Sequence, residues 1–295
     1  MTLGRLLKGT TLRSRLSLHR YRRVLRHPGA ELEARRLLGS LRRQGDADLR
    51  LDRRTAWTRF DARSFAGAAP TLDLLGSLIR RWVAEKDPRR LRGGGCPIDL
   101  LLPEDLRAHP EILDFALHDQ FLRATSEYLG QVPRLFHLRV WWSPPSDSLE
   151  GSRQFHYDHR DRRQVKIFVN LDAVDEAAGP LHFLGADDCA RFDARVGYRH
   201  GRIRDEEVYS ACPREHLRDS CGPAGSGVIV DTARCLHYGS RGNARDRLML
   251  AINYVRANSA VPNPSPTLDP VREELAARLY ADDPVRRFVL TAPAF

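Results

Sequence analysis

Residues 164–184, QVKIFVNLDAVDEAAGPLHFL, carry the clearest structural signal in the sequence. Over the first eight residues, aliphatic side chains at every second position alternate with Lys166, Phe168 and Asn170. A period of two indicates a strand with two distinct faces, so we expect Lys166 and Asn170 to lie on the same face and to approach any pocket there. Gly179-Pro180 then predicts a turn, and residues 181–184 predict a second, shorter strand.

Further strand signals lie on both sides of this stretch. Apolar runs rich in β-branched and aromatic residues occur at residues 135–142, 225–230 and 247–255. These runs are separated by turns and loops, and no regular alternation of strand and helix joins them. This organisation favours a mainly β protein with flanking helices, built as a sandwich or jelly roll, over a doubly wound parallel sheet.

Helical patterns flank the predicted strands. Residues 70–82 repeat apolar side chains at a helical period, residues 104–129 form a second helical block that Pro110 divides, and residues 269–280 predict a helix near the end. We therefore predict three regions. Residues 1–131 form an N-terminal helical region packing on the core, residues 132–260 form the β core, and residues 261–295 form a C-terminal helical extension.

Positive charge dominates the composition, with a formal net charge of +10. The positive residues are almost all arginine, which a genome rich in GC codons would produce, but they also suit an anionic partner. They are densest before residue 60, and two interpretations of that region stay open. It forms either a basic amphipathic helix in peripheral contact with an anionic membrane or a solvated helix covering the core. No nucleic-acid-binding motif accompanies these arginines, so we expect no nucleic-acid partner.

Cysteine usage and hydropathy indicate a cytoplasmic protein. The five cysteines are odd in number and contain no CxxC pair, which argues against both a disulfide framework and a thiolate zinc site. The sequence has no continuous apolar region typical of a secretory signal and no apolar stretch long enough to cross a bilayer. A reducing, cytoplasmic setting is therefore expected.

A metal-binding pattern, His156-Tyr157-Asp158, immediately precedes the predicted strand at 164–171. In an extended segment, residues i and i+2 point the same way, so His156 and Asp158 can both reach one ion. A three-residue pattern of this kind is common by chance, and it becomes informative only with a third ligand elsewhere in the chain.

His237 is the candidate third ligand, because a predicted strand leads through a turn directly to it. Two imidazoles and one carboxylate on one face of an octahedral ion leave three positions open, which is typical of non-haem Fe(II) oxygenases. Two open positions suit a bidentate 2-oxo acid, and the third suits O2. Arg247 opens the next predicted strand, where its guanidinium can hold the distal carboxylate of a dicarboxylic co-substrate.

Taken together, these segments resemble the phytanoyl-CoA dioxygenase family of 2-oxoglutarate-dependent oxygenases. The resemblance rests on the approach to the first ligand at residues 154–158, on the strand, acidic loop and Gly-Pro turn at 165–184, and on the block that runs from Asp231 through His237 and Gly239 to Arg247. It extends over roughly residues 132–256. Each part is weak alone, and the set is specific.

This resemblance implies a double-stranded β-helix (jelly-roll, cupin-like) core and an Fe(II)- and 2-oxoglutarate-dependent dioxygenase. Its catalytic metal ligands would be His156, Asp158 and His237, and Arg247 and Arg139 would bind 2-oxoglutarate. The expected reaction is hydroxylation of a C–H bond in a small-molecule, carrier-bound or lipid-like substrate, with release of succinate and CO2. Asp158 favours hydroxylation, because halogenating relatives have a small residue in its place.

Two departures from the family pattern are present. The family usually has a Pro-Gly-Ser-His loop where this sequence has Leu-Gly-Ala-Asp-Asp at residues 184–188, and it often has a serine where this sequence has Gly239, with Ser240 next to it. Neither departure removes a metal ligand. Two alternatives stay open: a metal-dependent hydrolase or isomerase, and a non-catalytic cupin-like binding protein. Neither of these needs 2-oxoglutarate, so a requirement for it separates them from the oxygenase.

Overall fold

The computed structural model describes residues 28–43, 45, 48–85, 97–197, 201–257, 259 and 264–293. The most basic part of the N-terminal region, before residue 28, lies outside this range. The membrane and solvent interpretations of the basic segment therefore stay predictions. Among the helices of the described part of the chain, none combines the length and the apolar character needed to cross a bilayer.

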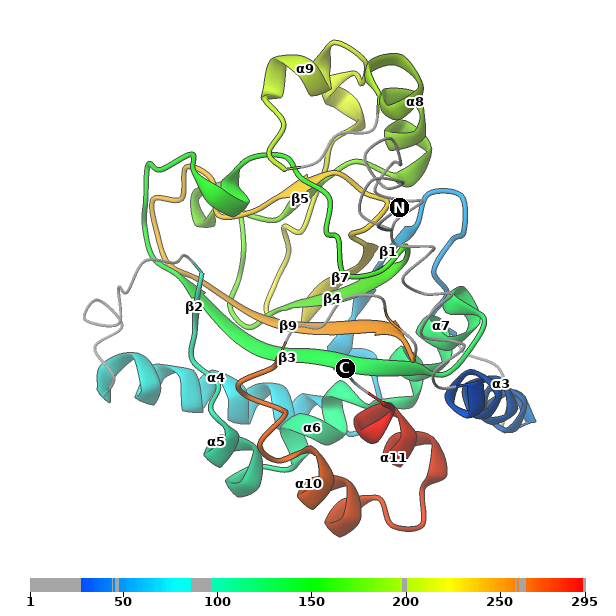
Figure 1. Ribbon diagram of the computed structural model, residues 1–295. Helices are drawn as coiled ribbons and strands as arrows, with labels where there is room; N and C mark the ends of the chain where they lie inside the picture. Colours follow the sequence, from blue (N-terminus) through cyan, green and yellow to red (C-terminus); the bar gives the residue numbers. More distant parts are fainter. Residues whose placement is uncertain are drawn as a thin grey trace, which may run out of the picture.

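Two antiparallel sheets form the core of the protein (Figure 1). The larger sheet has six strands in the order β1-β7-β4-β9-β3-β2, and the smaller has three in the order β6-β5-β8. The larger sheet comprises β1 (Trp57–Asp61), β2 (Ile98–Asp99), β3 (Pro133–Ser143), β4 (Gln164–Asn170), β7 (Ser226–Asp231) and β9 (Arg247–Arg256). The smaller sheet comprises β5 (His182–Phe183), β6 (Arg218–Asp219) and β8 (His237–Tyr238). This arrangement confirms the predicted jelly roll with flanking helices.

Most of the helices cover the outer face of the larger sheet, below it in the view of Figure 1, while two helices lie above the smaller sheet. The first group is α3 (Pro28–Arg43), α4 (Ala68–Glu85), α5 (Pro103–Ala108), α6 (Glu111–Ala116), α7 (Asp119–Leu129), α10 (Arg272–Leu279) and α11 (Pro284–Thr291). The second group is α8 (Ala186–Val196) and α9 (Asp205–Tyr209). Short 3-10 turns are η1 (Ala62–Ser64), η2 (Gly151–Arg153), η3 (Glu176–Ala178) and η4 (Arg214–His216).

Edge strands differ most from the sequence-based expectation. The strands β1 and β2 extend the larger sheet into the region predicted to be helical, where β1 pairs with β7 and β2 pairs with β3. These strands are short, and their stability comes from hydrogen bonds to a longer neighbour, which a local sequence pattern does not reveal. The predicted division of the chain at residues 131 and 260 stays a prediction.

The helix α4 shows how the outer layer is fixed. Its predicted apolar face is buried against the sheet, with Leu75 and Ile79 fully inaccessible to solvent. Further along the chain, α7 ends where expected, because Gly130 adopts a left-handed conformation with φ of 73° that disfavours other residues. The helical layer therefore supports β3, β4 and β9 from outside and leaves their inner face for the site.

Asp231, at the end of β7, joins this layer to the loop that carries the metal-binding pattern. The carboxylate is fully buried, and its Oδ1 accepts hydrogen bonds from the amides of Gln164, at 3.0 Å, and Ala233, at 3.2 Å. The Tyr128 hydroxyl of α7 donates to Oδ2 at 2.6 Å. The carbonyl of the next residue, Thr232, accepts a hydrogen bond from the main-chain N–H of Asp158 at 2.9 Å. The turn at Asp231 therefore also fixes the loop that carries Asp158.

Replacing Asp231 with alanine should destabilise the fold, because the Tyr128 hydroxyl and the Gln164 amide would stay buried without an acceptor. We expect the free energy of unfolding to fall by about 2–4 kcal/mol, measured by urea denaturation. Asp172→Ala, at an exposed position, is the matched control. Equal stability of the two variants would contradict this role for Asp231.

Candidate metal centre

The centre is built on a pair of main-chain hydrogen bonds between His156 and His237. Each residue donates its amide to the carbonyl of the other, at 3.1 Å in both directions. Directly opposed residues of an antiparallel pair project their side chains to the same side, so the imidazoles are adjacent, with ring centroids 4.2 Å apart. His237 opens β8, which pairs with β5, and His156 lies in the segment before β4.

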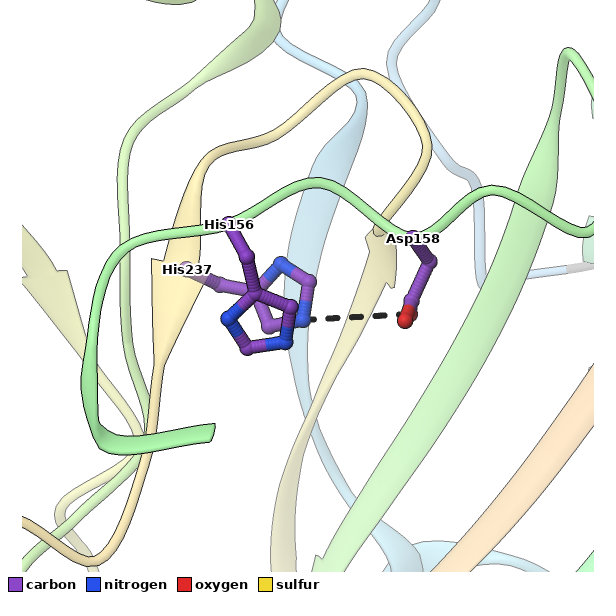
Figure 2. A group of neighbouring side chains, drawn as sticks. All are labelled: His156, Asp158 and His237. Carbon is purple, nitrogen blue, oxygen red and sulfur yellow. Dashed lines mark ion pairs between the residues drawn. The ribbon is translucent and has the colours of Figure 1, made fainter. Parts of the chain in front are cut away.

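Asp158 supplies the third predicted ligand from the same segment as His156. Figure 2 shows its carboxylate facing the two imidazoles, with a dashed line to His237. The distance from His237 Nε2 to Asp158 Oδ2 is 3.7 Å. One ligand atom from each of the three residues lies within 4.8 Å of the other two. The structure therefore brings together the three residues that the sequence pattern singled out.

Both histidines are held in the tautomer that suits a metal ligand. His156 Nδ1 lies 2.8 Å from the Gln154 carbonyl, and His237 Nδ1 lies 3.0 Å from the Cys235 carbonyl. Because a carbonyl only accepts, each Nδ1 carries the proton and each Nε2 keeps its lone pair. Burial lowers the pKa of His156 to about 2 and that of His237 to about 4. Both imidazoles are therefore neutral near pH 7.

Asp158 is ionised at the same pH. Burial by itself would raise the pKa of its carboxyl, but the nearby ammonium of Lys166 outweighs burial and holds that pKa below its usual range. Lys166 Nζ lies 2.6 Å from Asp158 Oδ2. Two neutral imidazoles and one carboxylate, close together and largely buried, fit a divalent transition metal bound on one face with open positions opposite.

A small cavity of about 70 Å³ adjoins the two histidines. The polar groups in its lining are the two imidazoles, Lys166, Arg247 and Ser152. The rest of the lining is apolar and consists of Pro97, Trp141, Phe168, Leu181, Met249 and Gly239. The cavity is thus mainly apolar, with two cationic side chains beside the candidate metal ligands.

Arg247 is buried at the start of β9 and is held in place by the protein. Its Nη1 donates to the Gly179 carbonyl at 2.7 Å, and its Nη2 donates to Ser143 Oγ at 3.3 Å. A Cβ atom on Gly239 would lie 3.3 Å from Nη1, so the missing side chain leaves room for the guanidinium. The structure therefore places Arg247 in the same cavity as the two histidines, and its predicted role in binding 2-oxoglutarate stays a prediction.

Two other positions considered in the sequence, Arg139 and Ser240, are not among the described residues that line the cavity. Arg139 instead places its Nε 3.6 Å from Asp99 Oδ2. Its predicted role in binding 2-oxoglutarate stays a prediction. Ser240, next to the position where the family often has serine, directs its hydroxyl to Asn243 Oδ1 at 3.4 Å. That bond points Ser240 to a neighbouring turn.

The contact between Lys166 and Asp158 is the main feature that sequence reasoning missed. The alternation in β4 placed Lys166 on a pocket-facing side, but it gave no sign that the ammonium would reach a metal ligand. The apolar wall was missed for the same reason, since Trp141 and Met249 come from strands that meet only in the folded sheet. Only the pairing of strands in the folded sheet shows that these residues lie close together.

A larger hollow of about 460 Å³ lies away from the metal centre, between α3 and α7. Arginines gather there: Arg42, Arg50, Arg53 and Arg123. At least two of them bind carbonyl groups near helix ends, because Arg123 donates to the Leu41 carbonyl of α3 and Arg53 to the Glu127 carbonyl of α7. Neutralising helix C-termini accounts for part of this cluster.

Comparison with known proteins supports the fold. No protein-family model matches the sequence, and no curated protein matches it. Among solved structures, AviO1 from Streptomyces viridochromogenes Tue57 is similar with a TM-score of 0.51 and 15% identity, over 72% of this chain and 94% of that chain. EctD from S. alaskensis, solved with 2-oxoglutarate and 5-hydroxyectoine, has a TM-score of 0.49 and 14% identity, over 69% and 73%. At these identities the similarity extends to the fold alone.

Alanine at either histidine should remove metal binding without unfolding the protein. For His156→Ala and His237→Ala we expect the dissociation constant for Mn²⁺ to rise about 100-fold or more, because two ligands cannot hold the ion as three do. Calorimetric titration measures the change, with His109→Ala, which lies outside the ligand group, as control. Unchanged affinity in folded His237→Ala protein would show that the metal binds elsewhere.

Proposed function

We propose that this protein is an Fe(II)- and 2-oxoglutarate-dependent dioxygenase that hydroxylates a C–H bond. The observation that carries the proposal is the grouping of His156, Asp158 and His237, together with a cavity that both imidazoles and the Arg247 side chain line. A ligand group with open positions accounts for the metal and O2. A buried guanidinium beside it accounts for a co-substrate with a second carboxylate.

Each polar group has a defined task in this proposal. Nε2 of His156, Nε2 of His237 and the Asp158 carboxylate would hold Fe(II), and the main-chain pairing of the two histidines keeps their rings adjacent. Arg247 would bind the distal carboxylate of 2-oxoglutarate, oriented by its bonds to Gly179 and Ser143. Iron bound there would supply the activation of O2, coupled to conversion of 2-oxoglutarate to succinate and CO2.

The walls of the cavity suit this chemistry. Trp141, Phe168 and Met249 project from three neighbouring strands and form an apolar surface beside the ligands. A surface of this kind excludes water, which protects reactive species from side reactions. Asp158 as a carboxylate ligand favours hydroxylation, since a halogenating site needs a vacant position there.

The substrate class belongs to the proposal as well. We infer a small-molecule or carrier-bound substrate, including lipid-like molecules, and an anionic one is favoured by the arginine-rich composition. The cytoplasm is the proposed location, where iron is most easily kept reduced.

Anaerobic titration of the Fe(II)-loaded protein with 2-oxoglutarate tests the function. We expect a weak visible charge-transfer band, because a chelating 2-oxo acid accepts charge from ferrous iron. The band should be absent in His237→Ala. In Arg247→Met it should appear only at about 10-fold higher 2-oxoglutarate or more, since a charge-assisted bidentate contact is lost while the metal ligands stay intact.

The alternatives predict a different outcome. If iron binds and no band appears at any 2-oxoglutarate concentration, the protein is not a 2-oxoglutarate oxygenase. A metal-dependent hydrolase or isomerase, or a non-catalytic binding protein, would then fit the site. A band that persists in His237→Ala would instead show that the iron lies outside the proposed centre. With the expected band in hand, succinate release provides the assay for a substrate screen.

A further inference from the structure

Lys166 forms an ion pair with Asp158, a candidate metal ligand. It lies on β4 in the same cavity as Arg247, with only a small part of its side chain exposed. Its Nζ is 2.6 Å from Asp158 Oδ2 and 5.9 Å from the centre of the Trp141 ring. The ammonium is thus paired with a candidate metal ligand, and its side chain lines the cavity that Arg247 also lines.

The oxygen that Lys166 contacts is the one that faces the metal position. Asp158 Oδ2 is also the atom that lies 3.7 Å from His237 Nε2. A divalent ion bound by the three ligands would therefore sit close to the Lys166 ammonium, and the two cations would repel each other. An anion on the cavity side of the metal would relieve this repulsion, because it would attract both the metal ion and the Lys166 ammonium.

The proposed co-substrate is an anion of this kind. A 2-oxo acid that chelated an ion held by His156, Asp158 and His237 would bring its chelating end close to the Asp158 carboxylate. Lys166 Nζ, already within hydrogen-bond distance of that carboxylate, is then close to the chelating end of the acid.

Arg247 cannot serve that end of the molecule. Lys166 is opposite Asn253 of β9 in the sheet, whereas Arg247 begins the same strand and is opposite Ser143 of β3. Strand residues advance about 3.3 Å each, so the two backbone positions lie roughly 20 Å apart along the sheet, although both side chains line one cavity. A five-carbon dicarboxylic acid has one carboxylate for each of two such cations.

We propose that Lys166 binds the metal-chelating carboxylate of the 2-oxo acid, while Arg247 binds its distal carboxylate. This inference rests on the proposed function and adds a residue to it. In the structure Lys166 pairs with Asp158. With metal and co-substrate bound, the ammonium would donate a hydrogen bond to the chelating carboxylate. Lys166 would therefore have two alternative anionic partners, the Asp158 carboxylate and the carboxylate of the acid.

Calorimetric titration of the Mn²⁺-saturated protein with 2-oxoglutarate and with pyruvate tests this division of labour. Pyruvate has the chelating end and lacks the distal carboxylate. We expect Lys166→Met to raise the dissociation constants of both acids by a similar factor, about 10-fold or more. Arg247→Met should raise that of 2-oxoglutarate and leave that of pyruvate unchanged. Arg107→Met, which removes an exposed arginine paired with Glu274, is the control.

The remaining outcomes separate this inference from the proposed function. If wild-type protein binds Mn²⁺ but neither acid, the proposed function fails. If it binds both acids and Lys166→Met binds them equally well at saturating metal, Lys166 only orients Asp158 and this inference is overturned. Lys166→Arg keeps the charge and should recover most of the affinity, and this recovery shows that any loss in Lys166→Met is not caused by misfolding.

Discussion

The reciprocal main-chain hydrogen bonds between His156 and His237 are the constraint on which the site depends. They pair a loop residue with the first residue of β8, two positions that lie far apart in the sequence, and they set both imidazoles on one side. The carbonyls of Gln154 and Cys235 then orient the rings. Asp158 is fixed separately, because its main-chain N–H donates a hydrogen bond to the Thr232 carbonyl, next to the turn at the buried Asp231. The geometry of the centre therefore comes from the backbone, and rigid backbone elements are what a preorganised metal site requires.

The distribution of charge around these ligands gives the site its chemical character. Burial keeps the two imidazoles neutral, and Lys166 keeps Asp158 ionised despite its burial, so all three groups are in the protonation state that a metal ion needs near pH 7. Arg247 and Lys166 add positive charge to a cavity with otherwise apolar walls. A dianionic chelating acid matches this arrangement better than a neutral or cationic ligand would, because it pairs with both cations and with the metal.

The sequence predicted the long strands and the candidate metal ligands but not the features that arise from strand pairing. The alternation in residues 164–171 predicted β4, and the His156, Asp158 and His237 pattern located three residues that the fold brings together. Edge strands such as β1 were missed because they depend on β7 for their hydrogen bonds. The ion pair of Lys166 with Asp158 was missed because it depends on how the loop before β4 folds back over that strand. Local periodicity carries no information about either contact.

A crystal structure of the protein with Mn²⁺ and 2-oxoglutarate, with the metal located by anomalous scattering, tests the central claim most directly. The account predicts one ion bound by Nε2 of His156, Nε2 of His237 and an Asp158 oxygen. The acid should chelate that ion, and its distal carboxylate should contact Arg247. An ion bound at other residues, or a fourth protein side chain filling the open positions, would contradict the account.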